Sequence, residues 1–196
     1  DFAEHGFILI DRINQMNKMY YMETISATNP CGEQPLPPYG ACLLGSLNLP
    51  RIVKKPFTAE ASIDYEAIKE VTAVAVRMLD NVIDLSNYPL EAQRKEAESK
   101  RRMGLGITGL ADLFIFMKQR YGSKESVETA GKVMGAITRS AYEASVELAK
   151  EKGAFPFFDA EKYCAGKFVA TLPESLRNDI RKYGIRNSHL TSIAPT

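Results

Sequence analysis

The sequence predicts a mixed α and β fold in which helix dominates. Two long segments carry helical apolar periodicity, whereas prolines recur through 20–53 and exclude a long helix there. A compact apolar run at 39–49 follows several of these prolines and favours a strand. We therefore expect strand, loop and strand over 20–53, mainly helix over 57–184, and a strand from residue 185 onward.

The helices can be justified one by one. A modest apolar stripe predicts a helix over 6–19. Apolar residues spaced three and four apart predict an amphipathic helix over 64–85 and a longer one over 123–152, which Gly153 ends. The polar segment 90–101 pairs Glu with Lys four residues on, which is typical of an exposed helix. The last expected helix is 174–183.

Composition excludes several classes of protein. The 25 basic and 24 acidic residues give a formal net charge of +1, which argues against a nonspecific nucleic-acid surface. No apolar run suggests a membrane span, and the first residues lack a basic leader, so we expect a cytoplasmic protein. Three cysteines and two histidines, with no Cys-x-x-Cys, predict neither a disulfide framework nor a metal site.

The stretch Asn29-Pro30-Cys31-Gly32-Glu33 places an amide, a thiol and a carboxylate at alternate positions. In an extended chain these three side chains would project to one side, although Pro30 and Gly32 favour a loop tip. A lone cysteine is commonly just a small buried hydrophobe. A reacting thiol, however, benefits from a carboxylate that moves a proton and an amide that orients a hydroxyl. We therefore take Asn29, Cys31 and Glu33 as candidate catalytic residues.

The other two cysteines receive different interpretations. Cys42 could return beside Cys31 if the intervening prolines make a turn, and a second thiol there could supply reducing equivalents. Cys164 has no polar constellation around it, so we expect a structural role.

Two further features are expected to carry no chemistry. Gly104–Gly109 fits G-x-G-x-x-G, but it follows a charged segment instead of a hydrophobic strand, which disfavours nucleotide binding. We expect these glycines to let a helix beginning near Ile107 pack tightly. The basic clusters 54–55 and 100–102 are expected to be solvated surface.

Four motifs, taken together and in order, resemble the catalytic subunit of ribonucleotide reductase. They are NPCGEQPL at 29–36, ACLLGSLNL at 41–49, RRMGLG at 101–106, and RN followed by SIAPT within 186–196. The NPCGE variant is most similar to the class II, vitamin B12-dependent ribonucleoside-diphosphate reductases. The resemblance implies that 1–196 is a helix-rich fragment of one catalytic domain, a ten-stranded α/β barrel with Cys31 on its central finger loop.

The resemblance also implies roles for individual residues. Cys31 would become a thiyl radical that abstracts the 3′-hydrogen of the ribose, Glu33 would take the 3′-hydroxyl proton, and Asn29 would hold the sugar hydroxyls. Cys42 would be one of two redox cysteines, with its partner upstream of Asp1. The segment 185–196 would be a strand leading into a phosphate-binding loop. The implied substrate-binding residues are Asn29, Pro30, Cys31, Gly32, Glu33, Pro195 and Thr196.

The implied cofactor is adenosylcobalamin, with most of its contacts outside this chain. The implied partners are a ribonucleotide substrate, thioredoxin or a similar dithiol donor, and dNTP or ATP effectors bound elsewhere; a homodimer is compatible with the resemblance. Two alternatives stay open: a class I large subunit with a separate metal-containing radical subunit, and a helical packing module without catalysis. The isolated chain is expected to be inactive.

Overall fold

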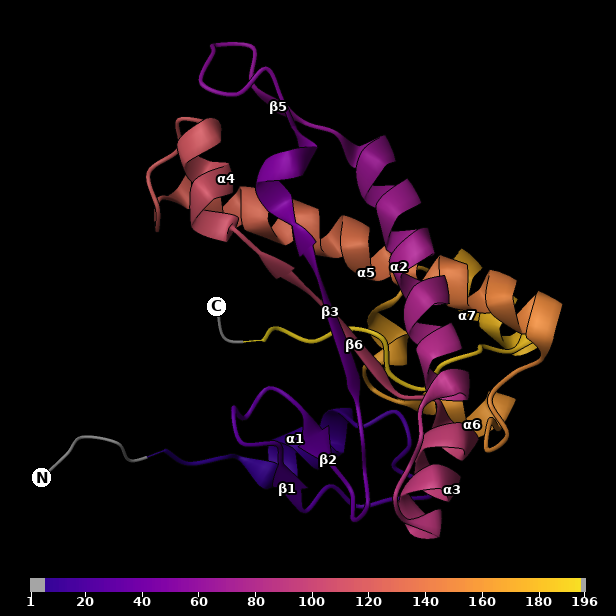
Figure 1. Cartoon of the computed structure of the whole chain (residues 1–196). Coiled ribbons are helices and arrows are strands. Elements are labelled where there is room, and N and C mark those ends of the chain that lie inside the picture. The colour runs from indigo at the N-terminus through magenta and orange to yellow at the C-terminus, as the bar shows by residue number, and fades with distance from the viewer. Residues whose placement is uncertain (1–5, 195–196) are drawn as a thin grey trace, which may run out of the picture.

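The computed structural model describes residues 6–194 and combines long helices with short strands (Figure 1). The helices are α1 (Ile10–Met16), α2 (Tyr65–Leu85), α3 (Glu91–Lys100), α4 (Leu110–Phe116), α5 (Lys124–Lys152), α6 (Ala160–Ala165) and α7 (Glu174–Tyr183), with 3-10 turns at Leu49–Ile52 and Val169–Thr171. The strands are β1 (Ala27–Thr28), β2 (Pro35–Leu36), β3 (Leu43–Asn48), β4 (Val53–Lys54), β5 (Ser62–Ile63) and β6 (Met103–Thr108). The predicted mixed fold with helix dominant is confirmed, and the described residues do not close a barrel.

The two long helices begin and end where the sequence predicts. The Asp64 side chain caps α2 by accepting from the backbone N–H of Ala67 at 3.1 Å. Ser123 caps α5 in the same way through the N–H of Ser126 at 3.2 Å, and Gly153 ends this helix with a positive φ of 85°. These caps are local signals, which is why the boundaries could be read from the sequence.

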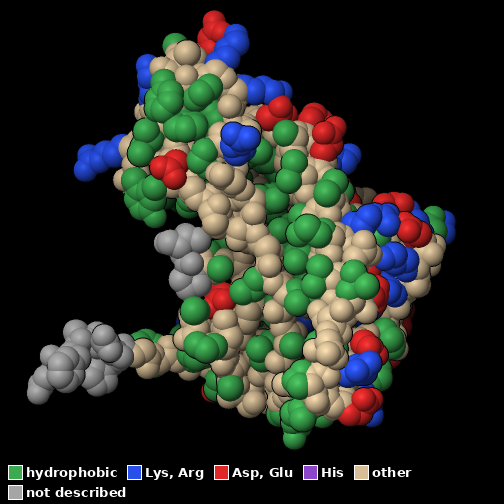
Figure 2. Space-filling model, viewed as in Figure 1, with side chains coloured by type: hydrophobic (Ala, Val, Ile, Leu, Met, Phe, Trp, Pro, Cys, Tyr) green, Lys and Arg blue, Asp and Glu red, His purple; other side chains and the backbone are tan. Residues whose placement is uncertain are grey.

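The helices α2 and α5 cross and pack against each other, and each buries one apolar face (Figure 1). The outer face of α2 instead exposes apolar side chains on the side of the molecule seen in Figure 2. They are Val71, Val74, Met78, Val82 and Leu85. None of the described helices is both long and apolar enough to cross a membrane.

The strand β6 lies between β3 and the chain segment 189–192. It pairs in parallel with β3, so that Leu43 lies opposite Met103. On its other side, Leu105 forms a parallel bridge with Thr191 and donates its N–H to the carbonyl of Leu190 at 2.8 Å. The expected strand from residue 185 was therefore wrong in extent, because within the described residues only this short stretch pairs with β6.

The two faces of this small sheet have different neighbours. A Cβ on Gly45 of β3 would lie 3.5 Å from the Leu79 side chain of α2, so this face packs on the helical layer. Gly104 and Gly106 of β6 alternate with Leu105 and face the opposite side. That side carries the hairpin of β1 and β2, as the next section describes.

Two expectations about local structure were wrong, and a third, the first helix, was wrong only in extent. The segment around Ile107 is strand β6, and the following helix α4 begins only at Leu110. The first helix covers only Ile10–Met16, which buries none of its side chains and lacks a side-chain cap at its start. Residues Lys100, Arg101 and Arg102 are buried, with exposed fractions of 5%, 4% and 5%, because each is paired with an acidic residue distant in the sequence.

Candidate active site

The motif Asn29–Glu33 lies in a tight loop between β1 and β2. The two strands pair antiparallel with Thr28 opposite Pro35. The N–H of Gly32 donates to the carbonyl of Asn29 at 3.0 Å, and Gly32 has a positive φ of 82°. Pro30 occupies the second position of this turn, where its fixed φ is favourable. The segment is therefore a loop tip and is not extended.

This loop brings Asn29 and Glu33 into direct contact. The Nδ2 of Asn29 donates to Oε1 of Glu33 at 2.7 Å, and its Oδ1 accepts from the N–H of Gln34 at 3.0 Å. The second carboxylate oxygen of Glu33, Oε2, is buried and has no hydrogen-bond partner among the described residues. Cys31 lies between them in the chain, and its free thiol is exposed. The loop therefore offers an accessible thiol and a carboxylate with one oxygen bonded to Asn29 and one without a described partner.

The loop is fixed against the glycine face of β6. The Oγ of Ser192 donates to the backbone carbonyl of Glu33 at 2.9 Å. A Cβ on Gly104 would lie only 2.2 Å from Nε2 of Gln34, and one on Gly106 only 2.5 Å from the carbonyl oxygen of Ser192. These two glycines therefore allow the hairpin and the segment 189–192 to approach the strand closely.

Cys42 lies directly before β3 and is a partly buried free thiol. Burial raises its pKa to about 12; Arg102 opposes this shift, whereas the nearby charge of Glu33 reinforces it. The thiol is therefore protonated at neutral pH. Cys164, by contrast, is a buried free thiol in α6, as expected of a structural cysteine.

A pocket of about 650 Å³ opens beside the hairpin. Glu33 and Gln34 line it together with Arg102 and His189, and apolar residues of the segment 7–16 form another part of its wall. Arg102 and His189 were not among the residues that the sequence singled out for this site. Pro195 and Thr196, which were, lie outside the described residues.

Buried polar groups hydrogen-bond to Arg102 and His189, two of the residues that line this pocket. Glu23 accepts from Nη2 of Arg102 and from Nζ of Lys100, each at 2.6 Å. Burial raises the pKa of Glu23, but the two cations outweigh it and leave the pKa below its ordinary value. His189 Nε2 lies 3.1 Å from Oδ1 of Asn17, and burial, followed by the charge of Arg102, lowers its pKa well below 6.5. The histidine is therefore neutral at physiological pH.

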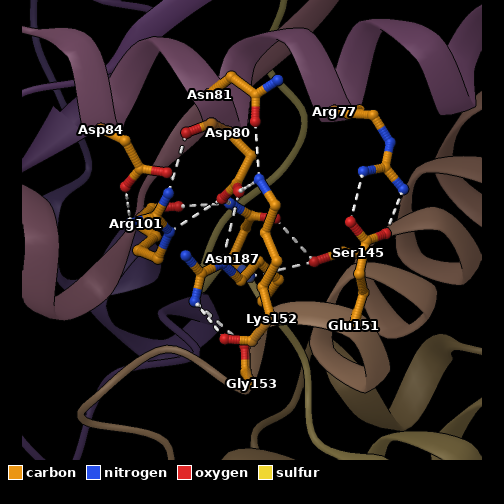
Figure 3. A network of polar contacts seen from close by, with 11 residues as sticks. Arg77, Asp80, Asn81, Asp84, Arg101, Ser145, Glu151, Lys152, Gly153 and Asn187 are labelled. Atoms are coloured by element: carbon orange, nitrogen blue, oxygen red, sulfur yellow. Dashed lines mark hydrogen bonds and ion pairs between the residues drawn. The ribbon is translucent and has the colours of Figure 1, made fainter.

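A second buried network holds the start of β6 to the helical layer (Figure 3). At its centre Asp80 of α2 is fully buried and accepts from Nε of Arg101 at 2.8 Å and from Nδ2 of Asn187 at 2.9 Å. Lys152 and Arg186 add longer ion pairs to the same carboxylate. Burial raises the pKa of Asp80, but the hydrogen bond and charge of Arg101 outweigh it and keep the carboxylate ionised. The network fixes the strand on which the hairpin rests.

The described residues contain no group of three or more His, Cys, Asp and Glu side chains that could hold a metal ion. The functional groups of the candidate site are instead a thiol, a carboxylate and an amide on one loop, together with a second thiol directly before β3.

Comparisons with known proteins point to one family. The family profile described as "Ribonucleotide reductase, barrel domain" matches residues 1–196. The chain is 39% identical over 194 residues to a vitamin B12-dependent ribonucleoside-diphosphate reductase of Mycobacterium tuberculosis (strain CDC 1551 / Oshkosh), covering 99% of this chain and 25% of that protein. It is 38% identical over 196 residues to a protein of the same name from Thermoplasma acidophilum, covering 99% and 23%.

More distant relatives carry a different name. Identity is 32% over 204 residues to the ribonucleoside-diphosphate reductase subunit alpha of Synechocystis sp., covering 94% of this chain and 25% of that protein. The chain thus spans about a quarter of the length of the curated relatives it matches.

Proposed function

Because this chain belongs to the ribonucleotide reductase barrel-domain family, we propose that it is part of a cytoplasmic enzyme that reduces ribonucleoside diphosphates to 2′-deoxyribonucleotides through a thiyl radical at Cys31. The observation that carries the proposal is the Asn29–Glu33 hydrogen bond of 2.7 Å, in the same tight loop as the exposed thiol of Cys31. The relatives' names support the reaction class.

The loop geometry supports a distinct role for each side chain. In the proposed reaction the Cys31 radical takes the 3′-hydrogen atom of the ribose, and Oε2 of Glu33 accepts the 3′-hydroxyl proton. That oxygen has no described partner, whereas Oε1 is held by Asn29. The amide of Asn29 has two N–H groups and uses one on Glu33, so the second can donate to a sugar hydroxyl.

Cys42 is proposed as one of the two thiols that reduce the substrate. Loss of the 2′-hydroxyl as water consumes two electrons and two protons, which two thiols supply as they become a disulfide. Burial favours the protonated thiol of Cys42, which is the form that can donate a hydrogen. The partner cysteine is proposed to lie outside this chain. Thioredoxin or a similar dithiol donor would then reduce the disulfide, while dNTP or ATP effectors and any subunit partner would bind elsewhere.

Adenosylcobalamin is the proposed source of the radical, in line with the names of the two relatives at 39% and 38% identity. When bound, this cofactor supplies an organic radical that can remove the hydrogen atom of a thiol. The exposed thiol of Cys31 at the loop tip is compatible with this cofactor. We propose that most of the cofactor's own contacts lie in other parts of the protein.

The full-length protein tests the proposal directly. Reduction of a ribonucleoside diphosphate is measured with a dithiol donor, with and without adenosylcobalamin, in wild type, Cys31→Ser and the matched control Cys164→Ser. Cofactor-dependent activity that disappears only in Cys31→Ser is the expected result. Activity that requires a metal-containing partner subunit would assign the protein to class I. Inactivity under both conditions would leave a helical packing module as the better account.

A further inference from the structure

We infer that Ser192 is a positioning residue for Glu33, an inference that rests on the proposed function of the same site. Its hydroxyl donates to the backbone carbonyl of Glu33 at 2.9 Å, across 159 positions of sequence. The carboxylate of Glu33 is held at one oxygen by Asn29, whose amide also accepts from the N–H of Gln34. Ser192 adds the connection from this loop to the sheet.

The hairpin needs such a connection because its own strands are very short. β1 and β2 contain 2 residues each, and a two-stranded hairpin is marginally stable in water even when its strands are longer. The hydrogen bonds between Asn29 and Gln34 close the loop but do not fix it relative to β6. A contact from the sheet to the peptide of Glu33 therefore determines where the carboxylate points.

Ser192 is itself held rigidly by its backbone. Its N–H donates to the carbonyl of Leu105 at 3.1 Å, and the absence of a side chain at Gly106 leaves room for its carbonyl oxygen. Any residue other than proline at position 192 can keep these backbone contacts. Only the contact to Glu33 depends on a hydroxyl, so the hydroxyl can be removed without removing the strand pairing.

Because the hydroxyl can be removed without the strand pairing, three variants test the inference. Ser192→Ala removes the hydroxyl, Ser192→Thr restores one at the same branch point, and Ser46→Ala serves as the matched control. Ser46 lies on β3 opposite Gly106, is exposed, and makes no side-chain hydrogen bond to the described residues. All three are compared with wild type in the full-length protein for kcat and KM of ribonucleoside diphosphate reduction.

We expect Ser192→Ala to lower kcat by about ten-fold or more with KM within about two-fold of wild type, because a small misplacement of a reacting group slows the chemical step more than it weakens binding. Ser192→Thr should recover most of the loss, and Ser46→Ala should match wild type. Hydrogen exchange of the peptide containing residues 29–34 should be faster in Ser192→Ala alone.

The outcomes separate this inference from the proposed function. An inactive wild type would overturn the proposed reaction. The hydrogen exchange of residues 29–34 would still test the contact between Ser192 and Glu33. Unchanged exchange of 29–34 in Ser192→Ala would overturn the inference, as would an active wild type with equal kinetics in Ser192→Ala and Ser46→Ala. A loss of kcat that Thr does not rescue, accompanied by a lower melting temperature, would reduce Ser192 to a structural role.

Discussion

The side chains of Asn29 and Glu33 are joined by a hydrogen bond of 2.7 Å within one six-residue loop, and the same amide accepts a backbone N–H from Gln34 at 3.0 Å. Because one end of the amide donates and the other accepts, rotating it by 180° would lose both bonds. The orientation of Asn29 is therefore set by its surroundings, and Glu33 is presented with one oxygen occupied and one free.

Replacing Asn29 by Ala should lower kcat by about ten-fold or more, because it frees the Glu33 carboxylate and removes the acceptor for the N–H of Gln34. The measurement is steady-state reduction of a ribonucleoside diphosphate by the full-length protein. Asn87→Ala, at an exposed position, is the control and should retain wild-type kinetics. Equal activity of the two variants would argue against a role for Asn29.

Gly104→Ala should destabilise the protein by roughly 1–3 kcal/mol, because overpacking forces neighbours to move. The new Cβ would lie 2.2 Å from Nε2 of Gln34 and 2.7 Å from Cδ2 of Leu44, so these side chains must move to make room. The control is Gly131→Ala, at a position in α5 where a Cβ meets nothing within 4 Å and where better helix propensity should stabilise slightly. Urea unfolding of both variants tests the prediction, which fails if they change stability in the same direction.

Asp80→Asn should lower the free energy of unfolding by roughly 3 kcal/mol or more, because it leaves the buried cation of Arg101 with its inner partner neutralised. Glu151→Gln removes a carboxylate from the solvent-exposed pair with Arg77, and only a small change is expected there. Chemical unfolding of the two variants measures the contrast. Similar losses in both would show that burial of Asp80 does not determine the strength of its network.

Alkylation should distinguish the cysteines of the reduced protein. Cys31 is exposed, whereas burial raises the pKa of Cys42 to about 12 and leaves little of the reactive thiolate near neutral pH. Iodoacetamide at pH 8 should therefore modify Cys31 at least about ten-fold faster than Cys42. Mass spectrometry of the digested protein over time gives both rates, and comparable rates would contradict the environment described for Cys42.

The buried amine of Lys18 should make stability depend on pH. Its Nζ donates to the hydroxyl of Tyr142 at 2.8 Å, and burial, followed by the charge of Arg102, lowers its pKa from 10.5 to about 7. Between these two values the unfolded chain binds the additional proton, so stability should rise with pH from about 7 to about 10. The difference amounts to roughly 3–5 kcal/mol across that window.

The comparison with Lys18→Met isolates this effect, because other titrating groups are shared by the two proteins and cancel in the difference. The free energy of unfolding of wild type minus that of the variant should increase steadily through the window. A difference independent of pH would show that Lys18 keeps its proton in the folded protein.

The sequence predicted those elements whose signals are local. The periodicity and caps of α2 and α5 lie within the helices themselves, at Asp64, Ser123 and Gly153. The cluster 100–102 was misread as surface because its acidic partners, Glu23 and Asp80, are distant in sequence. Strand β6 was missed for the same reason, since both of its neighbours come from remote segments.

The candidate site likewise combines residues that a local motif reveals with residues that only the fold brings together. Asn29, Cys31 and Glu33 could be singled out because they form one short motif, and their proposed roles stay predictions. Ser192 and the pocket beside Glu33 depend on how β6 and the segment 189–192 meet the hairpin. The sequence carried only a faint signal of this contact, namely the alternating glycines at 104 and 106.

The hydrogen bond between Ser192 and Glu33 also has a consequence for biosynthesis. Its partners are 159 residues apart, so the loop leaves the ribosome well before the serine that anchors it. At typical rates of translation that interval is on the order of ten seconds. The nascent chain must therefore carry an unanchored hairpin with a free thiol at its tip during that interval, which makes Cys31 open to oxidation or to a chaperone before the catalytic loop is in place.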